Sequence, residues 1–365
     1  MKKLMVKALY LFIAGIFITT ISYAGQKEVS SRKKILVISS YDRNYVWSQQ
    51  TNEGLCAALL KFGYFDSQAQ ADEYTKNDHV ESSKAIVKKL WMDGKKKTKK
   101  EEKAGMAMEI IKIAGEFKPD LILLGDDDAA NYIGGQFLDT EIPVVFWGVN
   151  NTPVKYGLVE SIDKPGHNVT GVYQAGYYKE SMEFLKIIKP GVKKFAIIGD
   201  ESSSSRSHVK EVEFLVRDKK INLELVNTIM TGKFEEFKSK ILETKEKVDA
   251  FFVAQYSALK DEKGNYVTPS KVAEWYFNNV NIPEAVNQSQ FVLEGMLCCA
   301  DDSGYNQGYE AVVIADDILS KGKSPSTYPC RAPKRGKLMV NVKRAEMLKI
   351  TLTKEMGIEE YVEGP

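Results

Sequence analysis

The chain has 365 residues, of which 44% are hydrophobic, and its 51 basic and 49 acidic side chains give a formal net charge of +2. This length suits two globular domains of ordinary size. The near balance of charge argues against nucleic acid as a partner, because phosphate binding needs a clustered basic excess. Four cysteines are too few for a small domain held together by disulfides.

The first two dozen residues predict an export signal. Three lysines lie among the first seven residues, residues 8–21 are almost wholly apolar, and residues 22–24 place small side chains at the −3 and −1 positions of a cut after Ala24. The apolar run of about 14 residues is shorter than the roughly 20 that span a bilayer, although a retained anchor is the competing interpretation. Because Gly25 and not a cysteine follows the cut, we expect an unlipidated mature chain, periplasmic or secreted.

From residue 32 the chain alternates short apolar runs with amphipathic stretches. Continuously apolar strands separated by helices are typical of parallel sheets covered on both faces. The pattern therefore predicts an α/β protein, and a turn-rich passage after Asn150 divides it into two similar units with a cleft between them. The runs that we expect to be strands are 34–39, 120–125, 143–148, 195–199, 221–226, 249–254 and 291–297.

Polar and aromatic side chains follow several of these strands directly. Ligands of open parallel sheets lie at the carboxyl ends of the strands, where loops and helix N-termini meet. Small-molecule pockets combine aromatic walls with a few fixed polar groups. We therefore expect a ligand site formed by Tyr41, Asp42, Tyr45, Trp47, Asp126, Asp127, Asp128, Trp147, Asn150, Tyr173, Gln174, Ser203, Ser204, Ser205, Gln255, Tyr256 and Asp301.

The aromatic residues near these loop tips could either line the cleft or pack in a core, and most aromatic side chains belong to cores. Stacking or a cation–π contact could hold a planar or cationic group of a ligand. We expect Tyr41, Trp147 and Tyr256 to line the cleft, and about half of the following set to be packing residues. The set is Tyr41, Tyr45, Trp47, Trp147, Tyr173, Tyr177, Tyr178 and Tyr256.

Two further features have a plain structural interpretation. Residues 95–103 (KKKTKKEEK) form a charge run, which we interpret as a solvated helix end or mobile loop, with a docking patch as the alternative. The histidines His79, His167 and His208 are scattered without metal-ligand spacing, and we expect surface or capping roles for them.

Catalytic signatures are absent from the sequence. It contains no G-x-S-x-G elbow, no dinucleotide-binding glycine fingerprint and no GxxxxGK[ST] phosphate loop. The acidic stretches 126–128 and 301–302 could supply oxygen ligands to a divalent metal, but their spacing does not demand one. We therefore expect no enzymatic activity, no cofactor and no metal.

Several short motifs carry a resemblance to a known family. They are GHNVTGV at 166–172, PGVKK at 190–194, GYNQG at 304–308 with a helix ending at Gly322, and LMVNVKRA at 338–345. In this order they resemble the substrate-binding proteins of ABC transporters. These proteins have the type I periplasmic-binding-protein fold, and the similar branch includes tryptophan- and tyrosine-binding proteins.

The resemblance implies a domain organisation and a function. It implies two Rossmann-like lobes, residues 32–168 plus about 300–328 and residues 169–299 plus about 329–365. It also implies hinge closure on a small molecule and delivery to a membrane permease, by a chain that acts as a monomer. A sensory protein that presents its ligand to a receptor kinase is an alternative, and a metal-dependent hydrolase on the same fold is a second one.

One departure from the family pattern bears on the ligand. Where the family usually reads G-T-x-x-A, this chain has Gly125 followed by three aspartates and Ala129. The carboxylates would attract a cationic ligand group, and the serines at 202–205 could bind an anionic one. Our hypothesis is a cationic or zwitterionic ligand, with its cationic end toward the first lobe. The competing interpretation is that the three aspartates only cap a helix.

Overall fold

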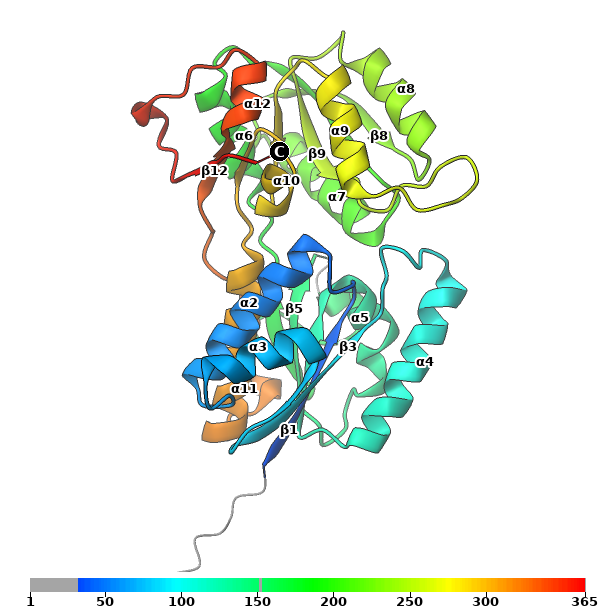
Figure 1. Ribbon diagram of the computed structural model, residues 1–365, viewed down its shortest axis with the longest axis vertical. Helices are drawn as coiled ribbons and strands as arrows, with labels where there is room; N and C mark the ends of the chain where they lie inside the picture. Colours follow the sequence, from blue (N-terminus) through cyan, green and yellow to red (C-terminus); the bar gives the residue numbers. More distant parts are fainter. Residues whose placement is uncertain (1–31, 151–152, 365) are drawn as a thin grey trace, which may run out of the picture.

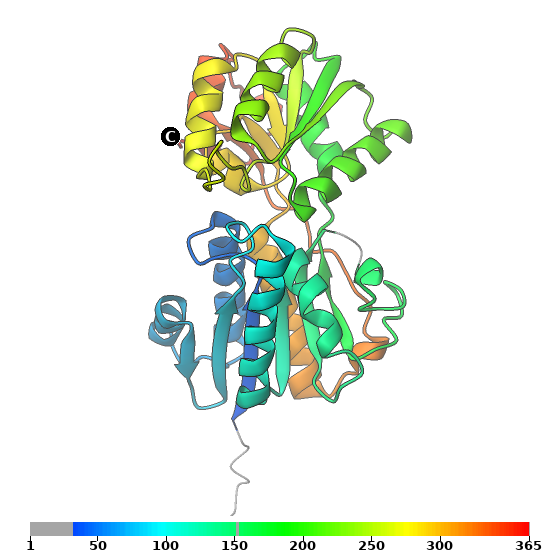
Figure 2. The same ribbon diagram turned by 90° about the vertical axis from the view of Figure 1, so that its right-hand side faces the viewer.

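The computed structural model describes residues 32–150 and 153–364, which form two α/β lobes, one above the other in Figure 1. Each lobe is one sheet with helices against its faces, as the turned view in Figure 2 also shows. The two-lobed α/β fold class expected from the sequence is therefore confirmed. The expected signal peptide and its cleavage site after Ala24 lie outside the described residues. Across the described ranges, no helix combines the length and apolar character needed to cross a membrane.

The first lobe has a six-stranded sheet in the order β2-β3-β1-β4-β5-β6, parallel except for the β2–β3 pair. Its strands are β1 (Lys33–Ser39), β2 (His79–Glu81), β3 (Ala85–Trp91), β4 (Leu121–Gly125), β5 (Val144–Val149) and β6 (Val169–Tyr173). Its helices are α2 (Val46–Lys61), α3 (Gln68–Asn77), α4 (Lys100–Phe117), α5 (Asp126–Tyr132) and α11 (Gly304–Lys321), with short 3₁₀ turns η1 (Gly134–Gln136), η2 (Pro153–Tyr156) and η3 (Pro325–Thr327). Strands β4 and β5 are buried along their whole length, which explains their uninterrupted apolar sequences.

The second lobe has a seven-stranded sheet in the order β13-β12-β11-β10-β9-β7-β8, in which only the β11–β12 pair is antiparallel. Its strands are β7 (Lys194–Gly199), β8 (Glu224–Met230), β9 (Ala250–Gln255), β10 (Glu284–Val286), β11 (Cys298–Ala300), β12 (Leu338–Asn341) and β13 (Glu360–Val362). Its helices are α6 (Tyr178–Ile188), α7 (Ser203–Arg217), α8 (Phe234–Thr244), α9 (Pro269–Asn279), α10 (Ser289–Leu293) and α12 (Val342–Met347), with the 3₁₀ turn η4 (Lys354–Met356).

Two details of the fold differ from the sequence-based expectation. The first crossover between the lobes follows Tyr173 and not Asn168, because β6 pairs with β5 and extends the first sheet. The run 291–297, expected to be a strand, contains the end of α10, and the strand of this region is β11. A continuous apolar run does not by itself distinguish a buried helix from a buried strand.

The four cysteines, Cys56, Cys298, Cys299 and Cys330, are all buried and free. Burial raises the pKa of each thiol, so these groups stay protonated and act as small apolar side chains. The described part of the chain is thus held together by packing without a disulfide.

Helix α11 packs against α2 through two glycines, although the second lobe separates the two helices in sequence. A Cβ atom added at Gly308 would lie 2.1 Å from the carbonyl oxygen of Thr51, and one at Gly54 would lie 2.0 Å from that of Tyr305. No real Cβ atom approaches a carbonyl oxygen so closely, so the glycines permit the contact. This contact lets Ala311, Val312 and other residues of α11 close the core of the first lobe.

We predict that Gly308→Ala destabilises the protein by about 1–3 kcal/mol, because the added methyl group forces α2 and α11 apart. Equilibrium unfolding in urea, followed by circular dichroism, measures the change in free energy. Gly105→Ala in α4 is the matched control: a Cβ atom there meets nothing within 4 Å, and alanine should stabilise this exposed helix by about 0.5–1 kcal/mol. Equal effects of the two substitutions would show that the close approach of the helices is unimportant.

Candidate functional site

The carboxyl ends of the central strands of both sheets face each other between the lobes. In the first lobe these ends lead into the loop before α2 and into the start of α5. In the second lobe they lead into the start of α7, Gln255 at the end of β9, and Asn287 after β10. We call this region, with the side chains that reach into it, the interlobe centre.

Direct hydrogen bonds join the lobes at the interlobe centre. The backbone N–H of Trp47 donates to the side-chain oxygen of Gln290 at 3.1 Å, and the amide of Gln290 donates in turn to the hydroxyl oxygen of Tyr45 at 2.9 Å. The Tyr45 hydroxyl lies 3.4 Å from that of Ser257. The start of α2 is therefore fixed against the second lobe by polar contacts.

The three carboxylates at the start of α5 are buried, and Asp126 and Asp128 hold different parts of the first lobe. Asp126 accepts a hydrogen bond from the indole N–H of Trp47 at 2.8 Å. Asp128 forms an ion pair with Lys103 of α4 at 2.6 Å. Burial raises the pKa of Asp126 well above the ordinary carboxyl value, while the bond from Trp47 acts in the opposite direction.

Asp127 and Ser40 fix the loops next to the start of α5. Asp127 accepts hydrogen bonds from the backbone and side-chain amides of Asn150, at 3.1 and 2.9 Å, and from the Tyr156 hydroxyl. The hydroxyl oxygen of Ser40, which follows β1, accepts a hydrogen bond from the Ala129 N–H at 2.8 Å. A serine outside the helix therefore contributes to its capping, and the aspartates make contacts beyond their own helix.

Lys95 is a central residue of the site that the sequence interpretation missed. Its side chain is buried, so the expectation that the charge run 95–103 is wholly solvated is wrong for this position. Its Nζ atom donates a hydrogen bond across the lobes to the Ser204 hydroxyl at 3.0 Å, and it lies 4.6 Å from the ring centre of Tyr41. The position of Lys95 after the end of β3 could have identified it as a site residue. Strand β3 was not predicted, however, because it carries two lysines and lacks a continuous apolar pattern.

His208 also belongs to the interlobe centre, and the expected surface or capping role is wrong for it. The residue is fully buried in α7. Its Nδ1 atom lies 3.0 Å from the carbonyl oxygen of Ala254, and its Nε2 atom lies 2.6 Å from the side-chain oxygen of Asn150 in the first lobe. Burial lowers the pKa of His208 to about 4, and the contact with Ala254 acts in the opposite direction.

Several buried polar atoms of the interlobe centre have no hydrogen-bond partner among the described residues. They are one carboxylate oxygen of Asp126, the hydroxyl of Ser205, the side-chain oxygen of Gln255, and both polar atoms of the Asn287 amide. Buried polar groups are normally hydrogen-bonded, because an unpaired one costs about 1–3 kcal/mol. A set of such atoms at the facing ends of two sheets is suited to binding a small polar molecule.

The expected aromatic residues fall into two groups. Tyr41, Tyr45 and Trp47 form a small buried cluster beside the interlobe centre, and the rings of the two tyrosines meet edge to face at 5.1 Å. Trp147 packs in the hydrophobic core of the first lobe. Tyr256 packs in that of the second lobe, where its hydroxyl donates to Glu294. Of the three aromatics expected to line the cleft, the structure thus places Tyr41 beside the facing strand ends and the other two in cores.

Tyr173 and Gln174 lie where the chain leaves the first lobe. The carbonyl oxygen of Tyr173 accepts a hydrogen bond from Gln307 at 3.2 Å. The amide of Gln174 donates to the Gly148 carbonyl and accepts from Gln288 of the second lobe. These contacts anchor the crossover and join it to both lobes.

Two expected site residues lie at the margin. Asp42 is partly exposed and forms an ion pair with Lys96 at 3.2 Å. Asp301 is buried near the crossovers, where it accepts a hydrogen bond from the Ser289 N–H at 2.7 Å. Burial raises the pKa of Asp301 to about 6.

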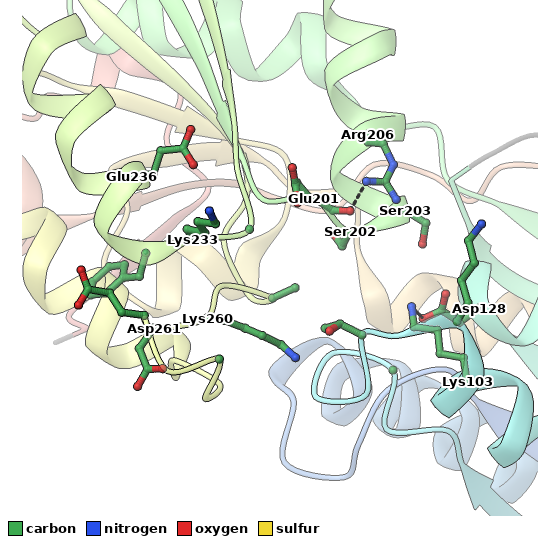
Figure 3. A pocket seen from close by; sticks show the side chains of 18 of the residues that line it. Lys103, Asp128, Glu201, Ser202, Ser203, Arg206, Lys233, Glu236, Lys260 and Asp261 are labelled. Atoms are coloured by element: carbon green, nitrogen blue, oxygen red, sulfur yellow. Dashed lines mark hydrogen bonds and ion pairs between the residues drawn. The ribbon is translucent and has the colours of Figure 1, made fainter.

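A cavity of about 1080 Å³ opens between the lobes next to the interlobe centre. Figure 3 shows Lys103 and Asp128 of the first lobe facing Ser203 and Arg206 of the second lobe across it. Its remaining lining mixes acidic and basic side chains. Within residues 32–150 and 153–364, no group of three or more His, Cys, Asp or Glu side chains is arranged to hold a metal ion.

We predict that His208 makes the stability of the protein depend on pH. The unfolded chain takes up a proton near pH 6.5, whereas the folded chain resists protonation until about pH 4. Stability from this residue is therefore complete above pH 6.5 and falls as the pH drops toward 4, with a loss of about 2 kcal/mol at pH 5.

His208→Gln should remove this part of the pH dependence, which urea unfolding at a series of pH values measures. The same substitution at His79, whose side chain is exposed, should leave the profile unchanged. If His208→Gln and the unsubstituted chain lose stability in parallel between pH 7 and 5, the buried ring is not responsible.

The sequence of the chain is similar to that of known proteins. The sequence profile of the family "ABC transporter substrate binding protein" matches residues 78–360. A tyrosine-binding protein of Clostridioides difficile is 27% identical over 215 residues, which are 58% of this chain and 59% of that protein. The chain thus matches less than two thirds of the length of this relative.

Solved structures show the same two-lobed fold. The ABC domain from Streptococcus pneumoniae in complex with L-Trp has a TM-score of 0.69 at 20% identity, over 91% of this chain and 100% of that one. A ligand-free, open substrate-binding protein with adhesive properties from Clostridium difficile has a TM-score of 0.65 at 21% identity, with the same coverage. The extensive profile match and the shared fold lead to one conclusion: this chain belongs to the family of ABC transporter substrate-binding proteins, which are extracytoplasmic solute-binding proteins of the type I periplasmic-binding-protein fold.

Proposed function

We propose that this chain captures a small zwitterionic molecule of the amino-acid class between its lobes and delivers it to the membrane permease of an ABC transporter. The observation that carries the proposal is the set of buried polar atoms on Asp126, Ser205, Gln255 and Asn287 that have no hydrogen-bond partner within residues 32–150 and 153–364. They lie at the facing strand ends of both sheets, where ligands of this type of fold bind. A polar ligand that bonds to them removes the cost of burying them unpaired.

The first lobe offers such a ligand a group that binds a cation, and the second lobe offers groups that bind an anion. In the first lobe, one oxygen of Asp126 has no partner among the described residues, and a ligand ammonium beside it would oppose the raised pKa and favour the carboxylate form that accepts its hydrogen bond. The Ser205 hydroxyl lies in the first turn of α7 in the second lobe, where the helix dipole and free N–H groups favour a carboxylate. A molecule with both charges contacts both lobes at once, and its binding energy therefore favours closure of the hinge.

Aromatic amino acids are the first candidates. The relative from Clostridioides difficile is a tyrosine-binding protein, and the structure from Streptococcus pneumoniae contains L-Trp. In this chain the cluster of Tyr41, Tyr45 and Trp47 lies beside the unpartnered atoms. Its rings could form one wall for an aromatic side chain.

The remaining parts of the proposal concern the setting of the protein. We propose that the export signal is cut near Ala24 and that the mature chain works as a monomer, in the periplasm or outside the cell. We further propose that it has no catalytic activity of its own, since capture and release need only the hinge and the binding groups. The cavity beside the interlobe centre offers the ligand a route of entry.

We expect L-tyrosine or L-tryptophan to raise the melting temperature of the mature protein in a thermal-shift assay. Ligand at 100 times its dissociation constant adds about 2.7 kcal/mol of stability, which corresponds to a shift of several degrees. Isothermal titration calorimetry then measures the affinity. A panel of other amino acids, polyamines, nucleosides and sugars tests the ligand class, and a response confined to sugars or nucleosides would contradict the proposal.

Asn287→Ala tests the location of the site. Because the Asn287 amide has no partner among the described residues, its loss should leave the melting temperature of the free protein almost unchanged but weaken ligand binding at least tenfold. Asn227→Ala, on the exposed edge strand β8, is the control and should leave affinity unchanged. Unchanged affinity in Asn287→Ala would place the ligand elsewhere.

A further inference from the structure

The buried ammonium group of Lys95 lies in surroundings that would suit a cationic ligand. It lies 4.6 Å from the ring centre of Tyr41 and 5.5 Å from that of Tyr45. Aromatic faces at this distance attract a cation through the ring quadrupole. The chain's own cation therefore holds the position that an aromatic cluster would offer to a ligand.

Carboxylates of both lobes also act on this ammonium group through their charge. Asp126, Asp127 and Asp128 of the first lobe and Asp200 of the second lobe interact electrostatically with Lys95. They oppose the lowering of its pKa that burial causes. Two cations of the chain itself, Lys95 and the Lys103 that pairs with Asp128, thus act on the acidic start of α5.

The hydrogen bond to Ser204 leaves donors of Lys95 for another acceptor. A lysine ammonium has three N–H donors and no acceptor, and the bond to the Ser204 hydroxyl at 3.0 Å uses one of them. Ser204 lies in the first turn of α7, and it is followed by Ser205, whose hydroxyl has no partner in the described part of the chain. A carboxylate between Lys95 and the start of α7 would meet a full positive charge, a hydroxyl and the positive end of a 15-residue helix.

We propose that Lys95 determines the charge selectivity of the interlobe centre, as the counter-ion of a ligand carboxylate and as the occupant of the cation position before Tyr41 and Tyr45. The site then selects molecules with a carboxylate over amines that lack one. This inference rests on the proposed function. It narrows the hypothesis of a cationic or zwitterionic ligand to the zwitterionic one: the ammonium group of a ligand is accepted at Asp126 only together with a carboxylate at Lys95.

The experiment compares three probes by isothermal titration calorimetry: L-tyrosine, tyramine, which lacks the carboxylate, and hydroxyphenylpropionate, which lacks the amine. The unsubstituted protein should bind tyramine at least tenfold more weakly than L-tyrosine. L-tyrosine and hydroxyphenylpropionate, the two probes that carry a carboxylate, should bind Lys95→Met at least tenfold more weakly than the unsubstituted protein. Tyramine should gain affinity, because the variant removes a like charge and leaves the carboxylates of α5 unbalanced. Since a misfolded variant would lose all binding, this gain is specific to the proposal.

Lys97→Met is the matched control, because Lys97 is partly exposed and its ammonium group contacts Asp93 of its own loop and Met106 of α4. It should leave all three affinities unchanged. If tyramine binds the unsubstituted protein as tightly as L-tyrosine, or if Lys95→Met weakens all three probes equally, the role of Lys95 is overturned while the proposed function stands. If neither L-tyrosine nor any other amino acid binds, the proposed function and this inference fall together.

Discussion

A lysine ammonium can be buried only if other groups replace its water, and this requirement organises the region where the two lobes meet. Around Lys95 the replacement comes from the faces of Tyr41 and Tyr45, the carboxylates of α5 and the hydroxyl of Ser204. Removing one partner of such a group leaves a charge uncompensated and costs several kcal/mol. These partners come from both lobes. The ammonium group therefore has all of its partners only when the two lobes lie together.

The direction of the strands explains why so many polar groups meet at this place. Parallel strands direct their carboxyl ends to one edge of a sheet, and the loops there carry the side chains that no ladder of hydrogen bonds uses. The two lobes turn these edges toward each other, so Trp47 of one lobe bonds to Gln290 of the other and Lys95 bonds to Ser204. The polar groups of the site therefore lie in the loops and helix starts that follow the strands, while the cores on both faces of each sheet hold these segments in position.

Much of this arrangement could be predicted from the sequence, because buried parallel strands have a strong local signal. The apolar runs of β1, β4, β5, β7 and β9 identified the two sheets, and the rule about strand ends then led to Tyr45, Asp126 and Gln255. Strand β3 was missed because lysines interrupt its apolar pattern, and Lys95 was misinterpreted with it. The buried His208 contacts Asn150 of the other lobe, which is far from it in sequence. A local sequence pattern cannot predict such a contact.

The position of α11 in the chain has a consequence for how the protein is made. This helix belongs to the first lobe, but its residues follow strands β7 to β11 of the second lobe in sequence, and a side chain at Gly54 or Gly308 would clash at its contact with α2. Contacts between such distant segments form slowly, because a long loop must close before they contribute. During synthesis, which starts at the N-terminus, the first lobe therefore lacks α11 at first and leaves an apolar face uncovered. The first lobe is therefore completed only after strands β7 to β11 of the second lobe have been made.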